Sequence, residues 1–157
     1  MGWNTSAVFV ADHDPLAMLT TAATATGEEV HGDEATSGLR HDVVYTARTG
    51  RWHELWDPSL VYVTTEIDLT GHRALSVVFS SVSSSYGFTY HDGQTLARRL
   101  VYADGEPVVN EGAPLPVEQG LTFPAWGPDE DFVWAVIDEI TGITFDLDRR
   151  YQVHQVH

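Results

Sequence analysis

The chain has 157 residues, of which 43% are apolar, and a formal net charge of −15. This length and apolar content predict a single globular domain over residues 1–157 and exclude an intrinsically disordered chain. Cysteine and lysine are both absent, which excludes disulfides, thiolate catalysis, Schiff-base chemistry and the lysine of a phosphate-binding loop.

The first predicted element is a strand over Trp3–Ala11, which ends in an apolar run. The Asp-Pro step that follows favours a turn, with Asp14 as the N-cap of a helix that starts at Pro15. This helix is expected to end near Gly27. The polar segment 28–40 is predicted to be an exposed loop.

The next segments are rich in β-branched and apolar residues. Asp42–Arg48 predicts a second strand, and Arg51–Trp56 fits either a strand or a helix because its apolar residues satisfy both periods. Leu60–Ile67 and Ala74–Val82 are expected to be strands separated by a turn.

A hairpin is the clearest local signal. Segment 86–101 alternates between apolar and polar residues on both sides of Asp92-Gly93, a dipeptide typical of type I′ turns. A two-residue loop at this position places Phe88 opposite Ala97. A second turn at Asp104-Gly105 continues the chain into another strand, so a meander is expected.

The last regular element is a helix. It is predicted to begin at Pro128, with three carboxylates in the first turn, and to end at Gly142. Its apolar stripe consists of Phe132, Val133, Val136, Ile137 and Ile140. Segment 143–145 is expected to form a short strand, and residues 149–157 a frayed tail.

The fold class expected from these elements is α+β. An antiparallel meander sheet of about six to seven strands would carry two helices packed on one face.

Three blocks of the sequence resemble an uncharacterised actinobacterial family of small acidic proteins, known as a domain of unknown function. The blocks are Gly2–Asp14, with its strand and Ala-Asp turn, the hairpin segment Tyr86–Pro116, and Ile140–Phe145 with its Gly-Phe ending. The resemblance implies a shared fold. It assigns no catalytic residue, because no activity is established for the family.

The corner Asp12-His13-Asp14 is the main candidate for chemistry. Two carboxylates and an imidazole can act as acid and base or bind a divalent cation, and His91 could join them. The alternative is that Asp14 caps a helix, Asp12 forms a turn and His13 is solvated. No other metal, catalytic or cofactor motif is present, and no cofactor is predicted.

Four further residues are candidates for binding: Trp52, Trp56, Trp126 and Arg98. Trp52, Trp56 and Trp126 lie beside turns with polar neighbours, where exposed rings can anchor a partner. Arg98 and Arg99 point to opposite faces of one strand, so one of them is expected near the covered face of the sheet, in an ion pair or against an anion.

The charge favours basic proteins or cations as partners and disfavours nucleic acid and anionic membranes, although acidity also serves solubility alone. With no membrane-length apolar run and no signal peptide, a cytoplasmic protein is expected. The leading interpretation is a non-enzymatic binding or interaction module, one version of which neutralises a basic partner. Two alternatives are a metal-assisted or acid–base hydrolase at Asp12-His13-Asp14, and a small-molecule binding module with its ligand between the sheet and the N-terminal helix. The oligomeric state is left open.

Overall fold

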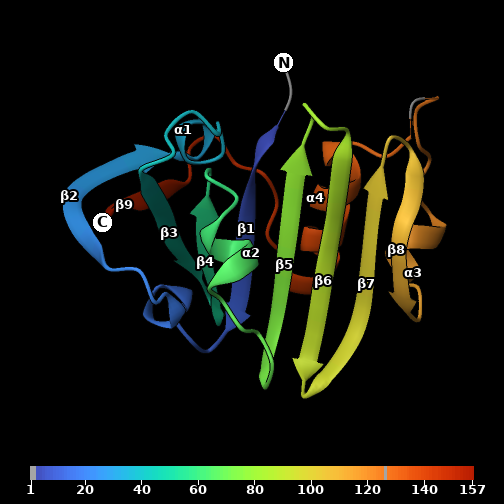
Figure 1. Cartoon of the computed structure of the whole chain (residues 1–157), viewed down its shortest axis with the longest axis horizontal. Coiled ribbons are helices and arrows are strands. Elements are labelled where there is room, and N and C mark those ends of the chain that lie inside the picture. Colours follow the sequence, from blue (N-terminus) through green and yellow to red (C-terminus); the bar gives the residue numbers. More distant parts are fainter. Residues whose placement is uncertain (1–2, 126) are drawn as a thin grey trace.

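The computed structural model describes residues 3–125 and 127–157. In this part of the chain, nine strands form one antiparallel sheet in the order β2-β9-β3-β4-β1-β5-β6-β7-β8 (Figure 1). The strands are β1 (Asn4–Ala11), β2 (Ala23–His31), β3 (Val43–Thr49), β4 (Trp52–Asp57), β5 (His72–Ser80), β6 (Ser85–Gly93), β7 (Thr95–Ala103), β8 (Glu106–Gly112) and β9 (Arg150–Val156). The helical segments are η1 (Pro15–Met18), α1 (Gly32–Ala35), α2 (Tyr62–Thr65), α3 (Pro116–Gln119) and α4 (Glu130–Thr141).

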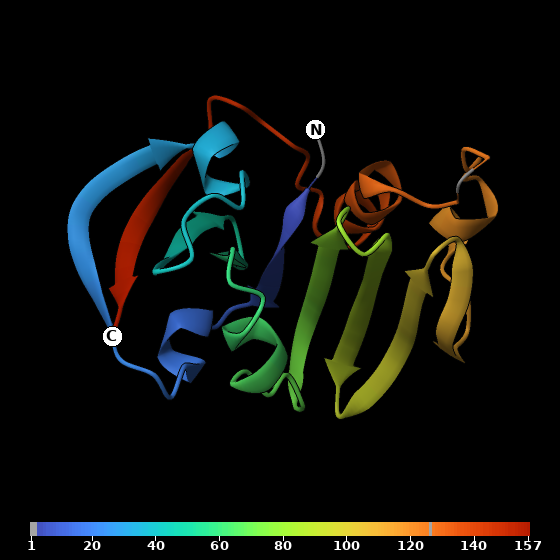
Figure 2. The same cartoon turned by 45° about the horizontal axis from the view of Figure 1, so that its top comes forward.

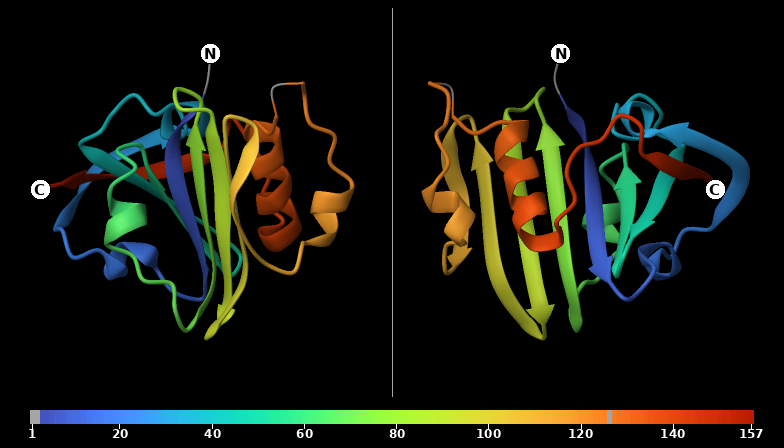
Figure 3. Two further views of the ribbon diagram at one scale, coloured as in Figure 1. Left: turned by 45° about the vertical axis from the view of Figure 1, so that its right-hand side comes forward. Right: turned by 180° about the vertical axis from the view of Figure 1, so that it is seen from behind.

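The antiparallel α+β class is confirmed, and the expected strand count of six to seven is too low. The prediction that two helices pack on one face is also wrong: α4 covers one face, whereas η1 and α2 lie on the other (Figure 3). None of the helices in the described residues has the length and apolar character needed to cross a bilayer.

The helix α4 is confirmed together with its C-cap Gly142, but it begins at Glu130, two residues after the predicted start at Pro128. Asp129 accepts a hydrogen bond from the backbone N–H of Asp131, and Gly142 ends the helix with a φ of 76°, a conformation that glycine adopts without strain. The helix packs on β5 and β6. Its buried residues join Trp56 and Phe79 in the larger of two apolar clusters.

The opposite face of the sheet is covered over only half of its width. Leu16 from η1 and Val63 from α2 pack against Val8 and Leu55, so β1 and β4 are buried on both faces. Over β5, β6 and β7 this face carries no helix from residues 3–125 or 127–157 (Figures 1 and 2). A step is thereby formed between α2 and the uncovered strands.

The predicted N-terminal helix is wrong after its first turn. Asp14 caps η1 as expected, with Oδ1 accepting the backbone N–H of Leu16, but residues 23–31 form β2, an edge strand. This segment is rich in threonine, whose branched Cβ favours strands. The loop predicted over 28–40 accordingly contains the end of β2 and the single-turn helix α1.

Segment 60–67 contains α2 in place of the predicted strand. The side chain of Asp57 determines this local structure, because Oδ2 accepts the backbone N–H groups of Tyr62 at 2.7 Å and Val63 at 3.1 Å. A carboxylate that binds the first free N–H groups stabilises a helical turn.

The predicted frayed tail is also wrong. Residues 150–156 form β9, which pairs with β2 on one side and β3 on the other. Tyr151 and Val153 are buried in the α4-side cluster at 3% and 1% exposed. Segment 143–145, expected to form a strand, is irregular chain that leads towards β9.

The hairpin of β6 and β7 is confirmed, and its predicted register is wrong. Asp92 pairs with Thr95, and a bulge after Tyr90 brings Phe88 opposite Leu100 instead of Ala97. The turn lies one residue later than expected, with Gly93 at a φ of 69°. The meander continues through the Asp104-Gly105 turn into β8.

Candidate functional site

The corner Asp12-His13-Asp14 is exposed, and its side chains bind separate partners. The carboxylate of Asp12 forms an ion pair with Arg51 at 2.7 Å, and that of Asp14 accepts the N–H of Leu16 at 2.9 Å. The ring of His13 lies 5.0 Å from the ring of His72. The two carboxylates are thus occupied by an arginine and by a helix cap.

His91 does not join this corner; it lies on β6, in a separate hollow described below. Among residues 3–125 and 127–157, no three His, Asp or Glu side chains are grouped as a metal site requires. The hydrolase interpretation therefore gains no support from the positions of Asp12, His13, Asp14 and His91.

The tryptophans that were candidates for anchoring a partner are buried wherever they are described. Trp52 is 6% exposed, with the guanidinium of Arg73 lying 5.5 Å from its ring centroid, and Trp56 is fully buried against Phe9. Neither ring is available as an anchor for a partner. Trp126 lies outside the described residues.

Arg98 is 2% exposed and forms a two-pronged ion pair with Glu118 of α3. Its Nε donates to Oε2 at 2.9 Å and its Nη2 to Oε1 at 2.7 Å, while Nη1 donates to Asn110 at 2.6 Å. Since the carboxylate of Glu118 already occupies the guanidinium, Arg98 holds α3 onto β7 and β8.

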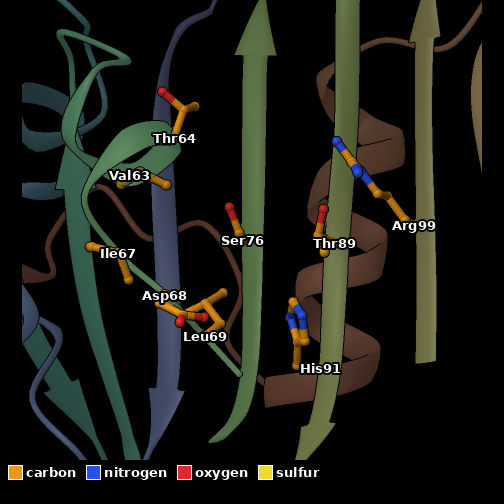
Figure 4. Close-up of a pocket in the computed structure, with 9 residues that line it drawn as sticks. All are labelled: Val63, Thr64, Ile67, Asp68, Leu69, Ser76, Thr89, His91 and Arg99. Carbon is orange, nitrogen blue, oxygen red and sulfur yellow. The ribbon is translucent and has the colours of Figure 1, made fainter. Parts of the chain in front are cut away.

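The step beside α2 forms a hollow of about 280 Å³, here called the sheet-face hollow (Figure 4). Val63, Ile67 and Leu69 form its apolar wall. Its polar lining consists of Thr64, Asp68, Ser76, Thr89, His91 and Arg99.

Strand register explains why the polar side chains meet. Arg99 pairs with Thr89 across β7 and β6, and Thr89 pairs with Ser76 across β6 and β5. The three side chains therefore form one row on the uncovered face. Figure 4 shows Arg99 reaching from β7 to β6, with Asp68 beyond β5 on the opposite side of the hollow.

Opposite charges flank this row. Asp68 is exposed, and the hydrogen bond from the backbone N–H of Thr70 is the main cause that lowers the pKa of its carboxyl, with smaller contributions from nearby His91 and His72. Asp68 is therefore an anion at neutral pH. The Nδ1 atom of His91 is buried and has no hydrogen-bond partner within the described residues.

A second concavity, the acidic hollow, lies where the edge strand β2 meets α1 and has a volume of about 570 Å³. Arg150 forms an ion pair with Glu29 at 3.1 Å, and Arg40 forms one with Glu28. No arginine in the described chain lies within ion-pair distance of Asp33 or Glu34. The charged and polar lining consists of Glu28, Glu29, His31, Asp33, Glu34 and Arg150.

Sequence reasoning did not identify either hollow. The cluster of acidic residues at 28–34 is visible in the sequence, but a segment predicted to be a loop gives no indication of a concave surface. Ser76, Thr89 and Arg99 lie on separate strands and meet only through strand register, and Asp68 comes from the chain between α2 and β5. The alternation of β7 did predict that Arg98 and Arg99 lie on opposite faces.

The ligand position predicted between the sheet and the N-terminal helix is filled by the packing of η1. Leu16, Met18 and Leu19 lie there against the apolar cluster of Val8 and Val10. The sheet-face hollow lies further along the sheet, over β5 and β6.

The chain matches no family model, no curated protein and no solved structure at the level that indicates common ancestry. The resemblance to an actinobacterial family therefore stays a prediction from its three sequence blocks.

Proposed function

We propose that the protein is a non-enzymatic interaction module that binds a basic protein partner at the acidic hollow. The single observation that carries this proposal is the concentration of four carboxylates in a concave surface of about 570 Å³, with one arginine in the lining. The net charge of −15 adds a long-range field of the same sign.

The position of the hollow favours a protein segment over a free cation. β2 is the first strand of the sheet, so its outer side has no neighbouring strand in the part of the chain that the structure describes. Backbone N–H and C=O groups along such an edge can pair with an extended segment. Arginine or lysine side chains of that segment would reach Asp33 and Glu34, which begin α1 next to the edge.

The exposure of the carboxylates determines how binding should respond to salt. Glu28, Glu29, Asp33 and Glu34 are all exposed, so their attraction to a cationic partner is screened by dissolved ions over about 10 Å at 0.1 M salt. Association should be fast at low salt and weaken steeply as salt is added.

The test compares two double variants with the wild-type protein. Asp33→Asn with Glu34→Gln removes two charges from the acidic hollow. Glu106→Gln with Glu111→Gln removes the same charge from β8, at the other edge of the sheet. Each purified protein serves as bait in a lysate of the native host, washed across a sodium chloride series, with captured proteins identified by mass spectrometry.

We expect the wild type and the variant with Glu106→Gln and Glu111→Gln to retain one basic protein at low salt and to release it at high salt. The variant with Asp33→Asn and Glu34→Gln should not retain it. Once purified, that protein should bind the variant with Asp33→Asn and Glu34→Gln about tenfold more weakly and the other variant as tightly as the wild type, since two exposed charge pairs together contribute about 1–2 kcal/mol. Equal retention by both variants, or retention that salt does not alter, contradicts the proposal.

A further inference from the structure

The arginines of this acidic protein are almost all occupied. In the described chain, five of the eight form ion pairs with carboxylates, and Arg48 and Arg73 donate hydrogen bonds to Gly50 and Tyr90. Arg99 alone has no hydrogen bond or ion pair within residues 3–125 and 127–157. Glu111 faces it across β7 and β8 without forming an ion pair.

The surroundings of Arg99 are built of unused polar groups. The hydroxyls of Ser76 and Thr89 form no hydrogen bonds with other described residues, and the buried Nδ1 of His91 has none either. A row of free donors beside an arginine is suited to an oxyanion, and a guanidinium binds a carboxylate through two parallel hydrogen bonds.

The other side of the hollow has the opposite charge. Asp68 lies beyond β6 and β5 from Arg99, and the two strand spacings from β7 to β5 alone amount to about 10 Å. A ligand with carboxylates at both ends would meet Asp68 unfavourably. A ligand with an ammonium group at the second end satisfies both sides.

Between the two charges the lining is apolar on one side. Val63 and Leu69 are buried at 5% and 6% exposed, with Ile67 beside them. A short hydrocarbon chain lying over Ser76 and Thr89 would contact this wall. A hollow of about 280 Å³ lies at the small end of ligand sites, which favours a molecule of amino-acid size.

We propose that the sheet-face hollow binds a small zwitterion, with its carboxylate at Arg99, Ser76 and Thr89, its ammonium group at Asp68, and an apolar chain against Val63, Ile67 and Leu69. This site is distinct from the acidic hollow at β2 and does not depend on it.

The test uses probes that differ only in their end groups. 6-Aminohexanoate carries both charges, hexanoate lacks the ammonium group and hexylamine lacks the carboxylate. Binding is followed by NMR shifts of the backbone amides of β5, β6 and β7, with 4-aminobutanoate and 8-aminooctanoate added to measure the preferred charge separation. We expect at least one of the three zwitterions to bind tenfold or more tightly than hexanoate and hexylamine.

Substitutions assign each end of the ligand. Arg99→Gln should weaken the binding of the zwitterion about tenfold or more and leave the weak binding of hexylamine unchanged. Asp68→Asn should likewise weaken the binding of the zwitterion but leave the binding of hexanoate unchanged. Arg48→Gln removes an exposed arginine from the same face of the sheet, on β3, and is the matched control. It should bind every probe as the wild type does.

Three results overturn the proposal: no zwitterion shifts the amides of β5 to β7 at millimolar concentration, hexanoate binds as tightly as the zwitterions, or Arg48→Gln weakens binding as much as Arg99→Gln. Circular dichroism of each variant establishes that it is folded, since Arg99 and Asp68 are both exposed and their replacement leaves the core intact.

Discussion

Glu54 is a charged residue inside the larger apolar cluster, at 1% exposed. Its Oε1 accepts hydrogen bonds from Tyr151 Oη at 2.6 Å and Trp56 Nε1 at 2.9 Å, and its carboxylate forms an ion pair with Arg149. Burial beside this carboxylate raises the pKa of the Tyr151 phenol, which therefore stays a donor over the physiological range.

Removing the carboxylate of Glu54 would leave these three donors unsatisfied in a buried site. We expect Glu54→Ala to lower the free energy of unfolding by about 3–5 kcal/mol, the typical cost of breaking a buried ion pair. The exposed pair of Glu29 and Arg150 supplies the control, because Glu29→Ala should cost less than about 1 kcal/mol. Urea denaturation measures both, and equal costs would contradict the structural role of Glu54.

His154 on β9 should make stability depend on pH. Its Nε2 lies 2.9 Å from the hydroxyl of Thr46, and burial lowers its pKa, while Asp14 has a smaller opposing effect. As the pH falls through 6.5, His154 takes up its proton in the unfolded chain before it does so in the folded protein. The free energy of unfolding therefore falls as the pH decreases. In urea titrations at a series of pH values, the free energy of unfolding of His154→Asn should fall less than that of the wild type between about pH 7 and pH 5. Parallel curves for the two proteins would contradict this assignment.

At the scale of whole elements, β9 was the hardest to predict and has a large structural role. Its backbone pairs with two strands, and Tyr151 and Val153 bury side chains that contribute about 1.5–3 kcal/mol each. We expect a chain that ends at Asp148 to lose its cooperative thermal transition, because β2 and β3 lose their common neighbour. Deleting His157 alone removes two hydrogen bonds, one to Thr24 and one to the backbone of Ala22, and should shift the melting temperature by only a few degrees. A truncated protein that melts like the full chain would refute the placement of β9.

Elements with strong local signals were predicted from the sequence, and elements defined by distant contacts were not. The caps of α4 and the alternation of β6 and β7 are contained within a few residues each. β9 reads as a polar tail because only two of its residues are buried and its partners lie over 100 residues earlier. The sheet-face hollow could not be predicted for the same reason, because Asp68, Thr89 and Arg99 are far apart in the sequence and belong to no common motif.

At the scale of the whole molecule, both edge strands of the sheet lack an outer neighbouring strand among the described residues, and both carry acidic residues. β2 contributes Glu28 and Glu29, and β8 contributes Glu106 and Glu111. Like charges on two open edges oppose pairing between copies of the chain. The same charges leave an edge available to a basic segment, which is the partner proposed for β2.

The net charge of −15 should oppose the compact state, since folding brings like charges together. Adding sodium chloride from about 20 mM to 300 mM shortens the screening length, so the melting temperature should rise by several degrees, equivalent to about 1–2 kcal/mol in a domain of this size. The Glu106→Gln with Glu111→Gln variant carries two fewer charges and should respond less; potassium chloride should act like sodium chloride, because screening depends on ionic strength and not on the ion. Affinity for the basic partner should fall over the same range. Salt thus affects folding and binding in opposite directions, and a melting temperature that falls with salt would show that self-repulsion does not limit the stability of the fold.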